Sequence, residues 1–229
     1  MLNALITLFR KEEETLTTAR NEFLEMLAIT SGMFKESVRG TWGDPLTPAE
    51  RSALYKNDRR VNKLERAVRR RVETTMFLRG KETDLTACVL LLHVVKDAER
   101  IGDYCKNLSE LREYDARSLA DDALSAELRE IASEVGRLLD ATPGVMGIDS
   151  ETDTAVSLLQ EARELGKRCD QMLVRIASCD KDPSAVTVLV LLSRFYKRIS
   201  AHTSNILSAV VMPLHKMDYF DERELVGQD

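Results

Sequence analysis

The chain has 229 residues, of which 44% are hydrophobic and 31% are charged, with only 10 glycines and 5 prolines. A chain of this length can bury a large core, and so few turn-forming residues indicate long helices. The net charge of −5 argues against a nucleic-acid-binding protein that acts through overall charge, and no run of about 20 apolar residues is present to span a membrane.

The first residues, MLNALITLFRKEEE, have neither a basic leader nor a small-residue cleavage site, so they do not form a secretory signal. The four cysteines, Cys88, Cys105, Cys169 and Cys179, lie in helical patterns without any CxxC pair. These features predict reduced core cysteines in a cytoplasmic protein.

Apolar residues at helical spacing predict a first helix, continuous or in two parts, that extends past Met33. The segment 40–48 breaks this pattern. Thr47 and Glu50 form a capping box with Pro48 at the first helical position, which starts a second helix that runs to about Arg79. Trp42 lies in the break, where local packing is a better expectation than anchoring a partner.

The second predicted helix carries a dense basic stripe opposite its apolar face. Between Arg51 and Lys81 there are 11 basic and 3 acidic residues. Lys63, Arg66 and Arg70 are the candidate docking residues for an acidic partner or anionic lipid. Two plainer alternatives are a solvated face and neutralisation within the fold by acids of a later helix, namely Asp121, Asp122, Glu127 and Glu130.

The segment 84–111 predicts a central helix whose apolar arc faces the core. Glu99 and Asp103 lie together on the edge of this arc, and two acids four residues apart favour a nearby cation. On the second helix, Asp58 and Asn62 occupy the same kind of flank position, so the two polar flanks could meet. The plain alternative is that Lys96 and Arg100 neutralise the acids as surface ion pairs.

Three further helices follow. The fourth covers 124–138 and is expected to end in a linker at 142–150; the fifth covers 158–176. Asp182, followed by Pro183, caps the sixth, which stops at Pro213. Because no segment has the alternating pattern of a strand, the predicted fold class is all-α.

An internal repeat organises these helices. With an offset of 98 residues, the sixth helix aligns with the third, so that Asp84 matches Asp182, Arg100 matches Arg198 and Asn107 matches Asn205. The chain is therefore predicted to form two tandem three-helix repeats, 1–113 and 114–229, each an up-down-up bundle that buries one face against the other.

The segment DAERIGDYCKN resembles the signature helix of the PhoU family of phosphate-uptake regulators, and KNDRRVNKLE resembles the helix that precedes it in that family. This resemblance implies a cytoplasmic protein that acts on a phosphate transporter or its sensor histidine kinase. It also implies a metal site with Glu99, Asp103, Asp58 and Asn62 as ligands, Asn62 standing where many members have a second acid. Such oxygen ligands suit iron, Mn, Mg or Ca, and Zn is known among relatives.

The second repeat departs from this pattern. Lys197 stands at the position of Glu99, Ser200 at that of Gly102 and Ala201 at that of Asp103, whereas His202 and Asn205 are retained. An ammonium in place of one carboxylate and the loss of the other predict that any metal site is confined to the first repeat.

The sequence thus predicts a regulatory, non-enzymatic protein of phosphate uptake and signalling that does not bind nucleic acid. Peripheral membrane contact and a homodimer are compatible with this prediction. The alternatives are a metal-free structural adaptor and, as a third choice, a carboxylate-bridged metal enzyme. Di-iron oxidases of helical bundles use Glu-x-x-His pairs, and none of the three histidines has a Glu three residues before it.

Overall fold

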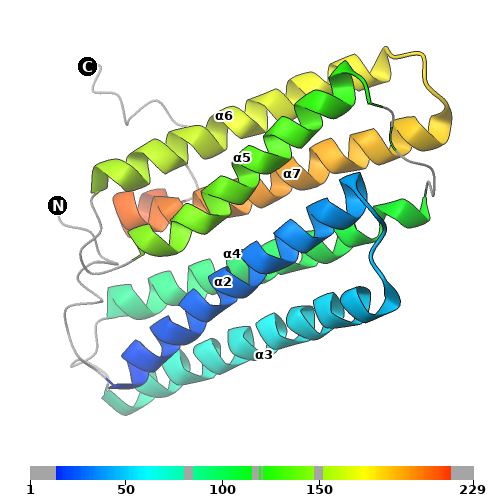
Figure 1. Cartoon of the computed structure of the whole chain (residues 1–229). Helices are drawn as coiled ribbons and strands as arrows, with labels where there is room; N and C mark the ends of the chain where they lie inside the picture. Colours follow the sequence, from blue (N-terminus) through cyan, green and yellow to red (C-terminus); the bar gives the residue numbers. More distant parts are fainter. Residues whose placement is uncertain (1–13, 80–84, 115–118, 120, 147–151, 218–229) are drawn as a thin grey trace, which may run out of the picture.

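The computed structural model describes residues 14–79, 85–114, 119, 121–146 and 152–217. These residues contain six α-helices, which Figure 1 shows as two groups of three. The helices are α2 (Glu14–Trp42), α3 (Pro48–Arg79), α4 (Leu85–Ser109), α5 (Ala123–Val145), α6 (Thr152–Ala177) and α7 (Pro183–Val211). The described chain contains no strand, which confirms the all-α fold.

Side-chain caps start three of the helices. At α3 the Glu50 backbone N–H donates to the Thr47 hydroxyl oxygen (3.3 Å), and the Glu50 carboxylate completes the capping box by accepting hydrogen bonds from the Thr47 backbone N–H (2.7 Å) and hydroxyl (2.8 Å). These donors stabilise the charged form and lower the pKa of Glu50. Asp122 caps α5 and Asp182 caps α7, both by accepting backbone N–H groups. The expected cap Asp84 lies outside the described residues.

One predicted helix end is wrong, because helix α2 continues through Gly40 to Trp42. Helix α5 ends at Val145, inside the segment 142–150 where the sequence placed its end, and it includes Pro143. Val145 and Met146 are buried, so packing extends α5. Pro143 is tolerated because its missing N–H removes only one hydrogen bond in the last turn.

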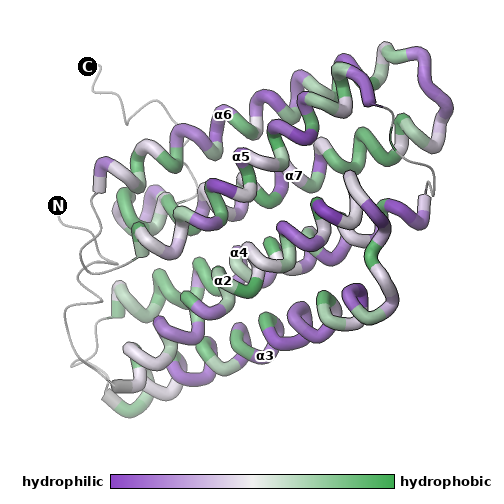
Figure 2. The backbone as a smooth tube through the Cα atoms, in the orientation of Figure 1, coloured by the Kyte–Doolittle hydropathy of each residue, from purple (hydrophilic) through white to green (hydrophobic). Residues whose placement is uncertain are grey.

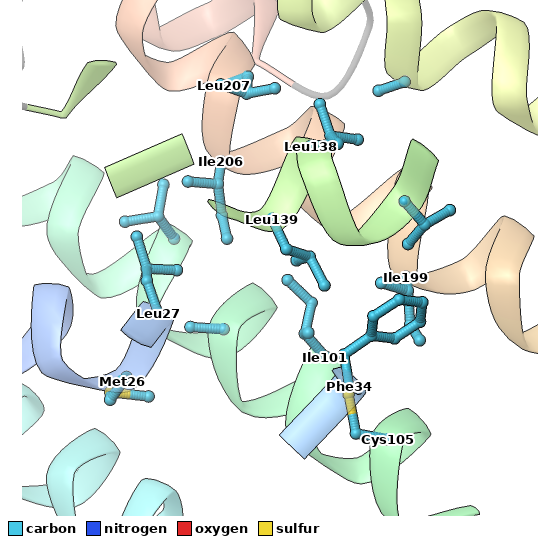
Figure 3. Packing of buried hydrophobic residues seen from close by; sticks show 14 of the residues in the cluster. Met26, Leu27, Phe34, Ile101, Cys105, Leu138, Leu139, Ile199, Ile206 and Leu207 are labelled. Carbon is cyan, nitrogen blue, oxygen red and sulfur yellow. The ribbon is translucent and has the colours of Figure 1, made fainter. Parts of the chain in front are cut away.

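The two repeats share a single hydrophobic core. Helix α4 packs against α7 and α2 packs against α5, so the first and third helices of each repeat meet those of the other repeat. Side chains from these four helices interdigitate in Figure 3, among them Phe34, Ile101, Leu139 and Ile206. Figure 2 shows hydrophobic residues recurring along each helix, which is the amphipathic pattern that the sequence predicted.

Trp42 packs within the fold and not locally, since its contacts are with the second repeat. Its indole N–H donates to the Tyr196 hydroxyl (3.0 Å), and the Arg129 guanidinium lies 4.9 Å from the Trp42 ring centroid. Tyr196 is fully buried, so Trp42 satisfies its polar atom. Among the described helices, none is long and apolar enough to cross a membrane.

Candidate functional site: acidic pairs between α3 and α4

The polar flanks of α3 and α4 meet, as the sequence predicted. Asp58 of α3 and Asp103 of α4 lie on either side of the same cation, the Lys106 ammonium. Its Nζ is 3.5 Å from Asp58 Oδ1 and 3.4 Å from Asp103 Oδ1. The role of Lys106 as the partner of these acids was not predicted from the sequence, although Lys106 lies three residues after Asp103, which is the spacing of an ion pair on one helix face.

Burial and charge act in opposite directions on Lys106. Partial burial favours its neutral form, but the nearby Asp58 and Asp103 carboxylates outweigh that effect and raise the pKa of Lys106. The amine is therefore charged at neutral pH. It neutralises two acids on two helices and links α3 to α4.

A second clamp of the same kind lies further along the helices. The Lys96 ammonium is 2.8 Å from Glu99 of its own helix and 4.0 Å from Glu65 of α3. The Glu99 side chain is only 12% exposed, and this carboxylate oxygen makes no well-aligned hydrogen bond. Arg100 reaches Glu99 and Asp103 only at 4.0 Å. Lys96 is therefore the main partner of Glu99, as the plain alternative expected.

Asn62 lies one turn after Asp58 on α3 and is partly buried. Its amide makes no hydrogen bond to another described residue. It is close in sequence to the Asp58 clamp, but the structure gives it no role in holding Lys106.

The residues as arranged do not fit a metal ion. Within the described part of the chain, no three His, Cys, Asp or Glu side chains converge into a group that could hold one. Two of the four predicted ligands, Asp58 and Asp103, are turned to the Lys106 ammonium, and Glu99 is turned to Lys96. A cation could enter between Asp58 and Asp103 only if Lys106 moved away, because like charges repel at this separation.

In the second repeat, the equivalent of Glu99 is Lys197, and its ammonium pairs with Asp170 of α6 at 2.5 Å. The charge is thus neutralised between the second and third helices of the repeat, as in the first repeat, with the base on the third helix and the acid on the second in both. A lysine at this position would repel a metal cation, and the confinement of any metal site to the first repeat stays a prediction.

The predicted docking residues Lys63, Arg66 and Arg70 are all exposed on α3. They line a shallow depression together with Ala67 and Arg71. None of the three forms an ion pair with another described residue.

The alternative in which acids of a later helix neutralise this stripe is wrong. The four acids proposed for it pair instead with bases of α5, α6 and the turn before α7: Asp121 with Arg129, Glu127 with Arg175, Glu130 with Arg168 and Asp122 with Lys181. The reason is topological, since α5 packs on α2, α6 and α7.

A further polar cluster, which the sequence analysis did not single out, joins the repeats. Asp97 of α4 is buried, and its Oδ1 lies 2.8 Å from His202 Nδ1 and accepts a hydrogen bond from Asn205 Nδ2 at 3.0 Å. The Tyr104 ring stacks on His202 and contacts Phe195. His202 and Asn205 are the residues of the second motif that were retained, and the structure gives them a role in repeat association.

This fold and these sites define a class of protein. It is a helical bundle of two tandem repeats in which ion pairs link adjacent helices, and the sequence predicted no catalytic site in it. Residues 23–111 match the model of the PhoU domain. This part of the chain is therefore similar to the PhoU domain, as the ERIGD segment predicted.

Two solved structures have the same fold. PhoU from Pseudomonas aeruginosa has a TM-score of 0.77 and 20% identity, over 86% of this chain and 96% of that one. The phosphate transport system regulatory protein PhoU from Streptococcus pneumoniae has a TM-score of 0.70 and 14% identity, over 85% of this chain and 92% of that one. No curated protein sequence matches significantly.

Proposed function

We propose that this protein is a cytoplasmic regulator of phosphate uptake that acts on a phosphate transporter or its sensor kinase and is not itself an enzyme. The observation that carries the proposal is the PhoU domain at 23–111, which contains both the α4 motif helix and the basic stripe of α3. The name of the Streptococcus pneumoniae structure, a phosphate transport system regulatory protein, supports it.

In this proposal the basic stripe on α3 brings the protein to the transport machinery, either through an acidic protein partner or through the membrane surface beside the transporter. Lys63, Arg66 and Arg70 are exposed and have no ion-pair partner among the described residues, so their charge is available to a partner. The α3–α4 clamps hold that surface in place, because Lys96 and Lys106 fix α3 on the central helix.

The metal-binding part of the sequence prediction has less support. Because Lys106 already neutralises Asp58 and Asp103, the regulatory role is proposed without a metal step. The specific alternative that this geometry favours is a metal-free adaptor. Elemental analysis of protein purified without chelator tests the metal-binding prediction, since stoichiometric metal would support it and would contradict a metal-free adaptor.

The decisive experiment is to delete the gene in its host and measure phosphate uptake and phosphate-responsive transcription at high and low phosphate. The proposal expects that uptake no longer responds to external phosphate and that the wild-type gene restores the response. An unchanged response would contradict it. Oxygen consumption after iron loading tests the enzyme alternative, because an oxidase should turn over.

A further inference from the structure

Five basic side chains form an unneutralised row on the outer face of α3. We call this row the basic face; it consists of Lys56, Arg59, Lys63, Arg66 and Arg70. All five are exposed, and none forms an ion pair with another described residue. The bases that flank the row behave differently: Arg60 pairs with Glu25, Arg69 with Glu65 and Arg71 with Glu22.

Beyond Arg70 and the exposed acid Glu73, the same face of α3 ends at an exposed aromatic residue. Phe77 follows Arg59 by 18 positions, which is about five helical turns, so both residues lie on the same face of α3. Phe77 is 90% exposed and its neighbour Leu78 is 80% exposed. The last turns of α3 are correspondingly hydrophobic in Figure 2.

The start of α4 adds to this apolar end. Leu85 and Val89 are 49% and 39% exposed, and they lie just after the segment that joins α4 to the end of α3. An end with four exposed apolar side chains beside a long basic row is unusual for a surface that only contacts water.

We propose that this face binds an anionic lipid surface, with the basic face on the phosphate headgroups and Phe77 and Leu78 inserted among the acyl chains. The row from Lys56 to Phe77 is straight and about 30 Å long, so it suits an extended charged plane. Lys63, Arg66, Arg70 and Arg71 surround a shallow depression that can seat a headgroup. Basic residues with aromatic and aliphatic side chains on one helix face are typical of interfacial helices.

This inference deepens the proposed function and rests on it for its setting, since a regulator of a membrane transporter gains from being held at the membrane. An acidic protein partner would use the charges but has no evident need for the exposed Phe77 end. That difference separates the two occupants experimentally.

The test is co-sedimentation of the full chain with vesicles of phosphatidylcholine alone and of phosphatidylcholine with phosphatidylglycerol. We expect binding only to the anionic vesicles, weakening as salt is raised. Lys63→Glu, Arg66→Glu and Arg70→Glu together should weaken binding by about a hundredfold or more. Phe77→Ser should weaken it by about tenfold, and that loss should persist at higher salt.

The matched control combines Arg163→Glu, Lys167→Glu and Arg198→Glu, which change the net charge equally at exposed positions of the second repeat. It should bind vesicles nearly as well as the wild type. A Phe77→Trp variant reports insertion directly, because its fluorescence should shift to the blue with anionic vesicles; the wild type, with Trp42 alone, serves as the baseline.

Absence of binding to anionic vesicles at low salt, or equal losses in the α3 and control triple variants, would overturn the proposal. The proposal would also be overturned if the protein did not bind vesicles but bound a purified transporter or kinase domain through Lys63, Arg66 and Arg70. That result would assign the face to an acidic partner. Vesicle binding that survives while the gene deletion leaves phosphate uptake unchanged would instead contradict the proposed function alone.

Discussion

Tyr104 of α4 and His202 of α7 stack on each other with ring centroids 5.7 Å apart, although they occupy equivalent positions in the two repeats. The contacts on either side of this stack are equivalent too: Asp97 meets His202, and Tyr104 meets Phe195, which is the repeat counterpart of Asp97. As the residue number rises in α4, that of its partner in α7 falls. Helices α4 and α7 are therefore antiparallel and related by a pseudo-twofold axis. The two equivalent contacts differ in chemistry, because one is polar and the other is aromatic.

The polar contact should contribute measurably to the association of the repeats. Asp97→Ala leaves the partly buried side chains of His202 and Asn205 without this acceptor, so we expect a loss of about 1–3 kcal/mol in the free energy of unfolding. Urea unfolding followed by circular dichroism measures it. Asp180→Ala, at an exposed position, is the control and should change stability by less than about 0.5 kcal/mol. Equal effects of the two variants would show that the Asp97 cluster is not structural.

Lys106 should decide whether the first repeat can bind a metal. Lys106→Met removes the ammonium between Asp58 and Asp103 and should raise the affinity for a divalent ion by about tenfold or more. Glu99→Ala with Asp103→Ala should abolish any such binding, and Lys197→Ala should leave it unchanged. Elemental analysis and metal-dependent thermal shifts measure the effect. Metal retained after loss of both acids, or two equivalent sites in the wild type, would contradict the assignment to the first repeat.

The stability of the contact between α2 and α5 should depend on pH through Asp140. Burial opposes ionisation of this carboxyl, but hydrogen bonds from Lys35 (2.7 Å) and Ser31 (2.6 Å) outweigh it and lower the pKa of Asp140 below 3.8. A group whose pKa is lower in the folded state stabilises the fold above its unfolded pKa, and this stabilisation is lost as the pH falls through the folded pKa.

Asp140→Asn should therefore destabilise the protein at neutral pH, and the difference from the wild type should shrink as the pH falls below about 4. Chemical unfolding of both proteins across this range measures it. A difference that stays constant with pH would mean that the charge of Asp140 does not contribute.

Reversal of Lys63, Arg66 and Arg70 to Glu should leave the fold intact. These side chains are exposed and form no ion pair with a described residue, so we expect the melting temperature to stay nearly unchanged while binding to the partner surface is lost. Differential scanning calorimetry beside the binding assay measures both. A large loss of stability would show that the charges are neutralised within the fold after all.

Local sequence patterns were enough to predict the six described helices and their pairing into repeats. Amphipathic periodicity is local, since residues three and four apart lie on one helix face whatever packs there. The capping box at Thr47 and the cap at Asp182 depend only on neighbours, and both were predicted. The offset of 98 residues likewise requires no knowledge of tertiary contacts.

Which charges meet across helices depends on how the helices pack. The acids Glu99, Asp103 and Asp58 were recognised as a group, but the choice of cation was not, because Lys106 reaches Asp58 only when α3 and α4 pack in one particular register. In the sequence Asp97 resembles any surface acid, and its burial is evident only from the packing of α7 on α4. An ion pair or a buried hydrogen bond between distant residues depends on side-chain placement to within about an ångström, and helical periodicity does not specify that placement.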